Sequence, residues 1–464
     1  MDEITRASAA ELAKAIRAKK LSSQEVVNAY LKRIENINPI LNAVVQLTAD
    51  TARAEAREAD ARLARGDVTG PLHGVPITVK DSFETAGVVS TGGTEGRKRF
   101  VPDRDATAVA RMRSAGAILL GKTNVPELSL AYESDNLVYG ATNNPYDIIR
   151  TPGGSSGGEA AVIAAGGSPL GLGSDSAGSI RLPAHFCGIA GIKPTTGLVP
   201  ATGHFPPYVW MMEQLSAAGP MARFVEDLML ALPILAGADW RDPGTVPVSP
   251  GDPGAVELSS LRAAFYTDNG IISPTPETVK LVKEAAKALS GAGLAVEEDR
   301  PEIIGQSHEL MRGLLAADGG AGLNILIQMA GTSVTHPLTR RLLESMRPCA
   351  VSAAEFGGMM VRWRFFRSAM LSFLEKYDVI ICPACARPAM PHGATTDDEN
   401  TLAFSYAVTY NLTGWPGVVV RGGTSPEGLP IGVQVVARPW REDVALAVAG
   451  YIETVLGGWQ PPPI

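Results

Sequence analysis

Cysteine and histidine are both scarce in this chain, which has 4 and 6 of them among its 464 residues. So few cysteines cannot form a disulfide framework at this length, and we expect reduced thiols and a cytoplasmic location. No run of 18 apolar residues occurs, and the opening MDEITRASAAELAKAIRAKK is charged throughout. We therefore expect neither a transmembrane helix nor a signal peptide, and no membrane partner.

Basic charge is also in short supply. The 41 Lys and Arg residues are outnumbered by 48 Asp and Glu residues, and no dense Lys/Arg run is present. Because phosphate binding requires a basic face, the net charge of −7 argues against nucleic acid as a main partner. With 45% apolar and 19% charged residues, the composition is that of a globular protein.

The periodic segments predict one large α/β domain over residues 1–464. Residues 1–70 have helical spacing, with a capping-box pattern at Ser22 and Glu25. In residues 70–200, apolar strands such as GVPITVKD and GAILLGKT alternate with helical segments such as DATAVARMRSAG. This alternation predicts a central mixed, mostly parallel sheet with helices on both faces.

Residues 203–215 and the irregular, helical residues 302–376 are candidates for a lid or helical insertions around a substrate pocket. The first, GHFPPYVWMMEQL, is apolar and aromatic with few charges. Such a lid favours a hydrophobic or aromatic substrate over a polar amide such as glutamine, although ordinary core beneath a loop has the same composition. The candidate pocket residues are Phe205, Tyr208, Trp210, Met211 and Met212.

Three short motifs point to other chemistries and are set aside. Gly116–Thr123 fits the P-loop expression, but a helix precedes it and its Ala-Ile-Leu-Leu interior predicts a strand. The pair Cys382 and Cys385 is one C-x-x-C at a strand end, which is too little for zinc. A nucleophile elbow at Ser156 requires an entering strand, which Pro152 would break.

Lysine and serine remain as candidates for the chemistry. Lys80 ends the strand GVPITVK, where burial would weaken its hold on a proton, and a neutral amine is a competent base. Ser155 lies in a glycine-rich turn, and Ser179 precedes an expected helix start, where the helix dipole favours developing negative charge. The turn 176–179 can aim several N–H groups at one oxygen.

The run GGSSGGEAAVIAAGGSPLGLGSDSAGSIRLPAHFCGIAGIKPT resembles the signature of the amidase signature family. GPLHGVPITVKD, NPYDIIRTPGGSSGG, YDVIICP and NLTGWPGVVV also resemble that family, so the resemblance covers nearly the whole chain. It implies the family's fold and a triad of Ser179 as nucleophile, Ser155 after a cis peptide as proton shuttle, and Lys80 as base. It implies no metal or organic cofactor. The implied oxyanion-hole donors are the N–H groups of Ser176, Ala177, Gly178 and Ser179.

Other polar residues in these stretches are expected to be structural. We expect Asp175 to accept backbone N–H bonds, and Arg181 to form an ion pair rather than bind a substrate carboxylate. His73 and His185 are expected to be hydrogen-bonded structural histidines. Four further histidines lie in no recognisable setting.

The chain departs from the family pattern at two positions. Ala177 stands where glycine is more frequent, and its Cβ would narrow the oxyanion turn or restrict its φ. Arg421 stands where proline is frequent, and the sequence offers no functional account of it.

The function that follows is an amidohydrolase that cleaves carbon–nitrogen bonds of hydrophobic or aryl amides, or carbamates (urethanes), through an acyl-enzyme at Ser179. The pattern is similar to aryl acylamidases. One alternative is the glutaminase-like subunit of a tRNA-dependent amidotransferase. The other is a non-enzymatic binding module on the same fold. We expect a small amide or carbamate as the substrate, and we consider a homodimer as the assembly of the chain.

Overall fold

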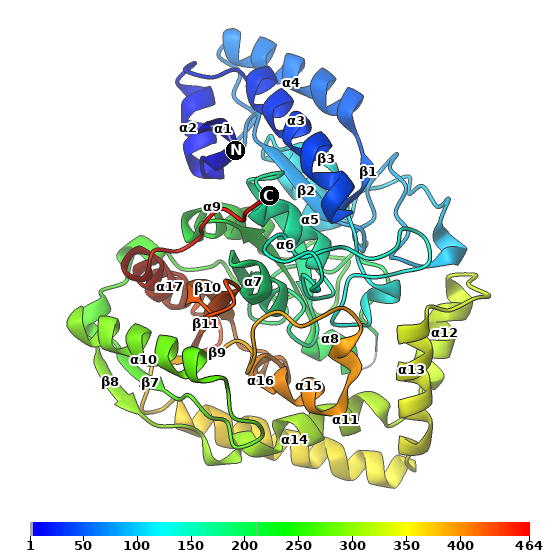
Figure 1. Ribbon diagram of the computed structural model, residues 1–464, viewed down its shortest axis with the longest axis vertical. Helices are drawn as coiled ribbons and strands as arrows, with labels where there is room; N and C mark the ends of the chain where they lie inside the picture. Colours follow the sequence, from blue (N-terminus) through cyan, green and yellow to red (C-terminus); the bar gives the residue numbers. More distant parts are fainter. Residues whose placement is uncertain (1–2, 210) are drawn as a thin grey trace.

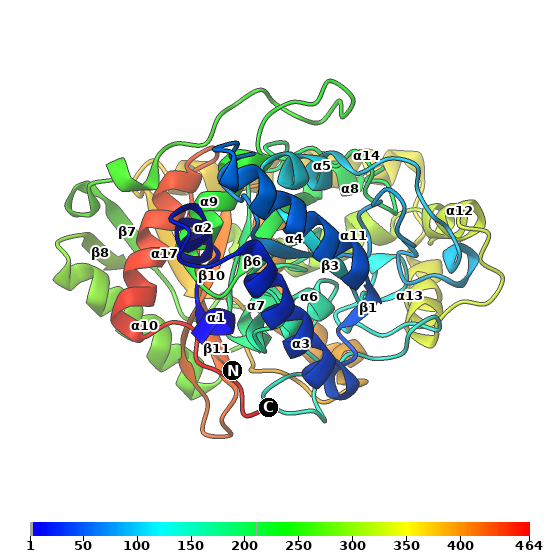
Figure 2. The same ribbon diagram turned by 90° about the horizontal axis from the view of Figure 1, so that it is seen from above.

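The computed structural model describes residues 3–209 and 211–464. Within them, an 11-stranded sheet has the order β1-β3-β2-β4-β6-β5-β10-β11-β9-β7-β8. Helices α6 and α7 pack on one face, and α9, α10 and α17 pack on the other (Figures 1 and 2). Because this one sheet joins strands from both halves of the chain, the chain is a single α/β domain, as predicted.

The strands of the sheet are short, and those at its centre are buried on both faces. Their bounds are β1 (Val44–Leu47), β2 (Pro76–Lys80), β3 (Ile118–Thr123), β4 (Leu170–Asp175), β5 (Ala190–Lys193), β6 (Ala217–Ala222), β7 (Arg262–Phe265), β8 (Ala295–Glu298), β9 (Val379–Pro383), β10 (Gly417–Thr424) and β11 (Pro430–Ala437).

The helices surround this sheet and build the two outer ends of the molecule. Their bounds are α1 (Glu3–Arg6), α2 (Ala9–Arg17), α3 (Ser23–Leu41), α4 (Ala49–Ala64), α5 (Thr107–Ser114), α6 (Gly157–Ala164), α7 (Arg181–Cys187), α8 (Met211–Leu215), α9 (Val225–Leu235), α10 (Pro276–Gly291), α11 (Ser307–Ala316), α12 (Ala321–Met329), α13 (Pro337–Met346), α14 (Ala353–Phe373), α15 (Asp398–Ala403), α16 (Ser405–Thr413) and α17 (Glu442–Leu456).

The sheet is mixed, as predicted, but the expectation of mostly parallel pairing is corrected by the structure. β2 pairs in parallel with β3 and β4, and β7 pairs in parallel with β8 and β9. The remaining six pairings among the described strands are antiparallel. The difference arises because β6 inserts between β4 and β5, and because a tight turn joins β10 to β11, which forces antiparallel pairing.

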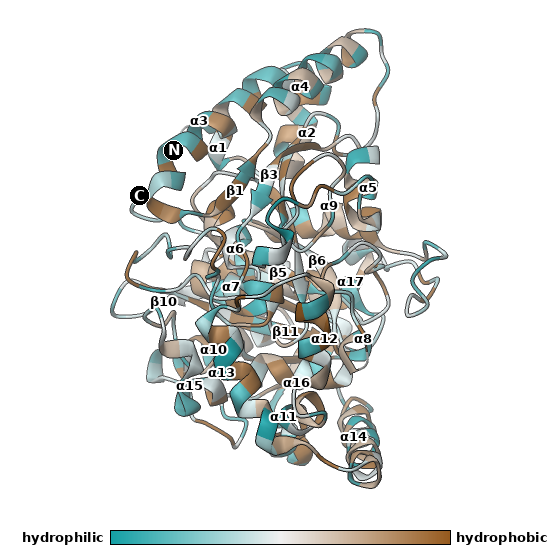
Figure 3. Ribbon diagram, turned by 90° about the vertical axis from the view of Figure 1, so that its right-hand side faces the viewer, coloured by the Kyte–Doolittle hydropathy of each residue, from teal (hydrophilic) through white to brown (hydrophobic). Residues whose placement is uncertain are grey.

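The N-terminal region is helical, as its spacing predicts, and its helices begin at capping boxes. Ser8 with Glu11 caps α2, and Ser22 with Glu25 caps α3. Both helices are amphipathic, which the alternating hydropathy along α3 in Figure 3 makes visible. The predicted helical region also contains one strand, β1, which adds to the edge of the sheet beside β3.

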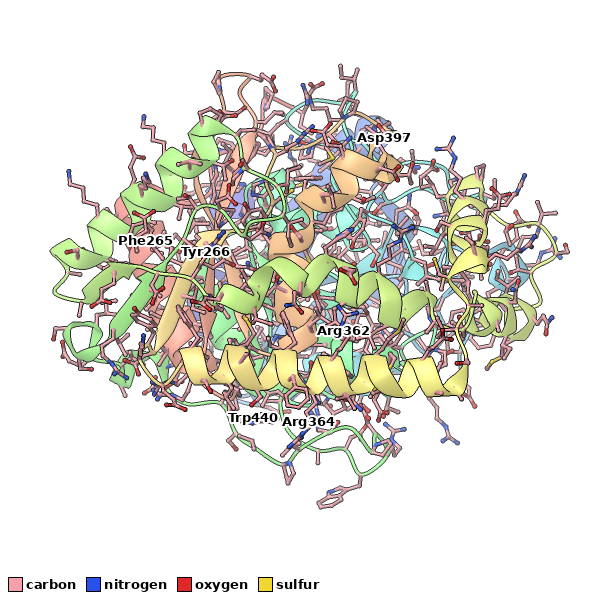
Figure 4. The ribbon with its side chains drawn as sticks, turned by 90° about the horizontal axis from the view of Figure 1, so that it is seen from below. Phe265, Tyr266, Arg362, Arg364, Asp397 and Trp440 are labelled. Atoms are coloured by element: carbon pink, nitrogen blue, oxygen red, sulfur yellow. The ribbon has the colours of Figure 1, made fainter. Side chains whose placement is uncertain are left out.

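The segment 302–376 forms helices α11 to α14, as its composition predicts. Figure 4 shows α14, with Arg362 and Arg364, running beside α11. Together with α12 and α13 these helices build one end of the molecule (Figure 1). No single helix among the described residues is long and apolar enough to cross a membrane. One pair of helical segments, 302–316 and 321–329, meets the length and composition criteria together, with a bend of 56° between the two segments.

Candidate active site

Lys80 and Ser155 are in direct contact inside the protein. Lys80 ends β2, which lies between β3 and β4, so its side chain is fully buried. Its Nζ lies 2.6 Å from Oγ of Ser155, within hydrogen-bond distance. The peptide bond between Gly154 and Ser155 is cis, as the family resemblance implies.

The surroundings of Lys80 favour its neutral form. Nζ donates to Oγ of Ser174 at 2.9 Å and to the carbonyl oxygen of Ser174 at 3.4 Å. Burial lowers the pKa of Lys80 to about 7, against the opposing negative charges of Asp175 and Glu159. A lysine with this pKa exists as a free amine in a large fraction of molecules near neutral pH, as a general base requires.

Ser179 is brought to the same place by the turn between β4 and α7. Its carbonyl oxygen accepts a hydrogen bond of 3.1 Å from the N–H of Ser156, which directly follows Ser155. Ser179 also lines a pocket described below. The structure therefore gathers the three residues predicted from the sequence at the ends of β2 and β4 and the start of α7.

Asp175 shapes the turn that carries Ser179, as expected. Its carboxylate accepts from the N–H groups of Gly178 at 2.7 Å and Ile180 at 3.1 Å. It also forms a buried ion pair with Arg181, with 2.9 Å between Nε and Oδ2. Burial alone would raise the pKa of Asp175, but the Arg181 guanidinium reverses this and holds it well below its usual range. Arg181 is thus the structural ion-pair partner that the sequence predicts.

The backbone N–H groups of residues 176–179 differ in whether they already donate a hydrogen bond within the protein. None of the described residues accepts a hydrogen bond from the N–H of Ser176, Ala177 or Ser179. Gly178, at a φ of 103°, already donates its N–H to Asp175. The oxyanion-hole role of the N–H groups of residues 176–179 stays a prediction, and three of them, at Ser176, Ala177 and Ser179, are not already engaged as Gly178 is by Asp175.

A cavity of about 600 Å³ opens above Ser179 and the 176–177 turn. Its walls come from α11 to α14, from the 129–132 segment and from α8. Most of the lining side chains are aliphatic, and the aromatic ones are Tyr132 and Phe356. The further apolar residues that line it include Val209, Met211, Met212, Leu314, Leu315, Leu323, Leu326, Leu342, Met346 and Val351.

The predicted pocket residues are only partly found in this lining. Met211 and Met212 contribute to it. Phe205 does not, because its ring packs behind the wall under the Arg97 guanidinium, 3.8 Å from the ring centre. Tyr208 also lies outside the lining, since its ring packs against His204 at 4.4 Å between ring centres. Trp210 lies outside the described residues.

The motifs set aside on sequence grounds have structural roles. Ser156 Oγ donates to the carbonyl of Ser174 at 3.2 Å, beneath the turn rather than in the pocket. Lys122, the P-loop lysine, is fully buried in β3 and donates to the carbonyl of Phe83 at 2.6 Å. Cys382 and Cys385 are buried free thiols. Among the described residues, no group of three or more His, Cys, Asp or Glu side chains is placed to hold a metal ion.

The remaining residues singled out from the sequence are also accounted for. His73 and His185 hydrogen-bond to backbone groups, as expected of structural histidines. Ala177 does not adopt a positive φ, so its Cβ causes no backbone strain, and it lines the cavity. Arg421 donates to the carbonyl of Gly458 at 2.8 Å and so ties β10 to the C-terminal segment.

Two residues near Lys80 were not identified from the sequence: Ser174 and His204. Nε2 of His204 lies 2.9 Å from Oγ of Ser174, which itself accepts from Lys80. Ser174 could have been found by its place in β4, since β4 pairs with β2 beside Lys80. His204 follows 30 residues after Ser174 in a loop with no periodic signal.

Comparisons with known proteins bear on this arrangement. A family model described as Amidase matches residues 25–446. Fatty-acid amide hydrolase 2-A of Danio rerio is 34% identical in an alignment 493 positions long, which covers 98% of this chain and 90% of the relative. A glutamyl-tRNA(Gln) amidotransferase subunit from Anaeromyxobacter sp. strain K is 34% identical over 490, covering 99% and 98%. The structure of 6-aminohexanoate cyclic dimer hydrolase superposes with a TM-score of 0.87 at 28% identity, covering 98% of each chain.

Proposed function

Because this chain belongs to the amidase signature family, we propose that it is an amidohydrolase for amides with a large apolar or aryl part, and for the corresponding carbamates. The observation that carries the proposal is the buried contact of 2.6 Å between Lys80 and Ser155. This contact lies beside the turn of Ser179, and Ser179 itself lines an apolar cavity. This arrangement supports the roles proposed for Lys80 as base, Ser155 as proton shuttle and Ser179 as nucleophile beside a substrate site.

In the proposed reaction, neutral Lys80 takes the proton of Ser155, which takes the proton of Ser179 as Oγ of Ser179 attacks the carbonyl carbon. The free N–H groups of Ser176, Ala177 and Ser179 stabilise the oxyanion of the tetrahedral intermediate. Collapse of this intermediate breaks the carbon–nitrogen bond, and the proton returns from Lys80 through Ser155 to the leaving amine. Water then hydrolyses the acyl-enzyme by the same proton path in reverse.

The lining of the cavity supports an apolar substrate. Its side chains are mostly aliphatic, with Tyr132 and Phe356 as aromatic contacts, so an acyl chain or an aryl ring loses contact with water there. The carboxylate of Asp318 at its rim accepts from the N–H groups of Gly320 and Gly322. The relative from Danio rerio acts, by its name, on fatty-acid amides, which agrees with an apolar cavity.

The test is a panel of substrates: a long-chain acyl anilide, a long-chain primary amide, an aryl carbamate, an ester and free glutamine. We expect the apolar amides to be cleaved and glutamine to be a poor substrate. A preference for glutamine, together with a requirement for partner subunits, would favour the amidotransferase alternative.

Ser179→Ala and Ser156→Ala form the matched pair for the nucleophile. Ser179→Ala should abolish turnover and covalent labelling by a fluorophosphonate, whereas Ser156→Ala should retain both. If the unmodified protein cleaves no member of the panel and is not labelled, the binding-module alternative holds instead.

A further inference from the structure

His204 is joined to Lys80 by two hydrogen bonds that pass through Ser174. Nδ1 of His204 lies 2.8 Å from the carbonyl oxygen of Pro206, and Nε2 lies 2.9 Å from Oγ of Ser174. Oγ of Ser174 in turn lies 2.9 Å from Nζ of Lys80. All three side chains are buried.

The protonation of the His204 ring follows from its partners. A carbonyl oxygen only accepts, so Nδ1 carries the hydrogen that is donated to Pro206. Burial, with a smaller effect from the charge of Lys80, lowers the pKa of His204 to about 3, so the ring is neutral at working pH. In a neutral imidazole with a proton on Nδ1, Nε2 is an acceptor. Ser174 must therefore donate its only hydroxyl hydrogen to His204.

The ring is held firmly in this orientation. Phe83 packs edge-on against it at 5.0 Å between ring centres, and Tyr208 packs against it at 4.4 Å. The backbones of Phe83 and His204 also form an isolated β-bridge. Because Phe83 lies in the segment that directly follows the end of β2 at Lys80, this bridge ties the histidine loop to the strand that carries the base.

We propose that His204 is a positioning residue that, by fixing the hydroxyl of Ser174, aims the lone pair of Lys80 at Ser155. This inference rests on the proposed function. A neutral amine has two N–H groups and one lone pair. Ser174 offers Lys80 two acceptors, its carbonyl oxygen at 3.4 Å and an Oγ whose hydrogen is already committed to His204. The lone pair is left for the hydroxyl of Ser155, which is the direction that proton removal requires.

Without His204, the hydroxyl of Ser174 is free to rotate and donate to the lone pair of Lys80. The Ser174 hydroxyl would then compete with the Ser155 hydroxyl for the lone pair of Lys80, and its hydrogen bond would stabilise the neutral amine of Lys80. The rate should fall, and the rise of activity with pH should move to lower pH. Other charged groups facing Lys80 are Asp175 from β4 and Glu159 from α6, both of which these changes leave in place.

The test compares His204→Ala with His204→Gln, because glutamine also has one acceptor for Ser174 and N–H groups for Pro206. His73→Gln is the matched control. His73 is a buried histidine that accepts from the N–H of Thr69 at 3.1 Å and faces the carbonyl of Ala59 at 3.0 Å. The readouts are the pH dependence of acyl-anilide hydrolysis and of the rate of fluorophosphonate labelling, with thermal unfolding as a check on folding.

For His204→Ala we expect kcat to fall about 10- to 100-fold. The midpoint of the rising limb should move about one pH unit lower, as one added hydrogen bond to the neutral amine would produce. His204→Gln should restore the midpoint and most of the rate, and His73→Gln should change neither. Labelling of the unmodified enzyme tests the proposed function; the dependence of the midpoint on residue 204 tests the positioning role. An unchanged midpoint in a folded His204→Ala, or a His204→Gln no better than alanine, would overturn it.

Discussion

Nζ of Lys80 lies 2.6 Å from Oγ of Ser155, and no part of the lysine side chain reaches solvent. Burial places the pKa of Lys80 at about 7, so its free-amine fraction grows as the pH rises through neutrality. We predict that kcat/KM rises with a midpoint near that value and then levels off on the alkaline side.

Substitutions at Lys80 and Glu159 test the origin of this profile. Lys80→Arg and Lys80→Ala should both lose at least about 100-fold in amide hydrolysis, since guanidinium remains protonated and alanine offers no base. Burial raises the pKa of Glu159 to about 7, and its ionised fraction raises the pKa of Lys80, so Glu159→Gln should move the midpoint slightly lower. A Lys80→Arg enzyme with near-normal activity would remove Lys80 from the mechanism.

A second prediction concerns the buried ion pair of Asp175 and Arg181. Asp175→Asn leaves the Arg181 guanidinium buried without its counter-charge and weakens the turn before Ser179. We expect a loss of about 3–5 kcal/mol in the free energy of unfolding, measured with urea. Activity should fall with it, because Asp175 holds the N–H groups of Gly178 and Ile180.

Asp50→Asn is the control for this change. Asp50 pairs with Arg53 on the surface of α4, where water screens the contact. We expect no measurable change in unfolding for this variant. Equal losses in the two variants would show that the buried pair has no special role in stability.

The strands and helices around the site could be predicted from the sequence because local patterns determine them. The apolar run before Lys80 is β2, and the misleading P-loop match is β3. The strand directions could not be predicted from alternation alone. They depend on β6, which enters the sheet between β4 and β5, and on the turn between β10 and β11.

The residues of the site also fall into those that the local sequence predicts and those that it does not. Lys80, Ser155 and Ser179 lie in long, specific motifs, whereas the contact of His204 with Ser174 arises only when a distant loop folds onto β4. Phe205 was predicted to line the pocket because it is aromatic. In the structure the Arg97 guanidinium covers its ring, and an aromatic residue in an apolar run has no local feature that reveals such a partner.

A third prediction uses the space around two glycines. A Cβ on Gly154 would lie 2.5 Å from the carbonyl oxygen of Ala131 and 2.7 Å from the N atom of Glu133. Since these are backbone atoms, Gly154→Ala must displace Ser155, and we expect kcat to fall about 100-fold. A Gly154→Ala enzyme of normal kcat would show that the position of Ser155 is not critical.

Gly358→Ala is the matched control in α14, where a Cβ would meet nothing within 4 Å. Here alanine should raise the free energy of unfolding by about 0.5–1 kcal/mol, because glycine in a helix interior loses more conformational entropy on folding. Activity should be unchanged. Kinetics and urea unfolding of both variants provide the comparison.

The last prediction concerns the apolar cavity, and it compares a methionine that lines the cavity with one that does not. Met212 lines the cavity, whereas Met329 lies on α12 with 65% of its surface exposed and is not part of the lining. A lysine at position 212 places a charge against the substrate's apolar part, and removing the contact of one such side chain costs about 1.5–3 kcal/mol. Met212→Lys should therefore lower kcat/KM for a long-chain acyl anilide about 10- to 100-fold, mainly through KM.

Hydrolysis of a small amide such as propionamide should change little in Met212→Lys, because propionamide does not reach this wall of the cavity. Met329→Lys should leave the hydrolysis of both substrates unchanged. Equal losses for the long and the short amide in Met212→Lys would mean that the cavity does not hold the apolar part of the substrate.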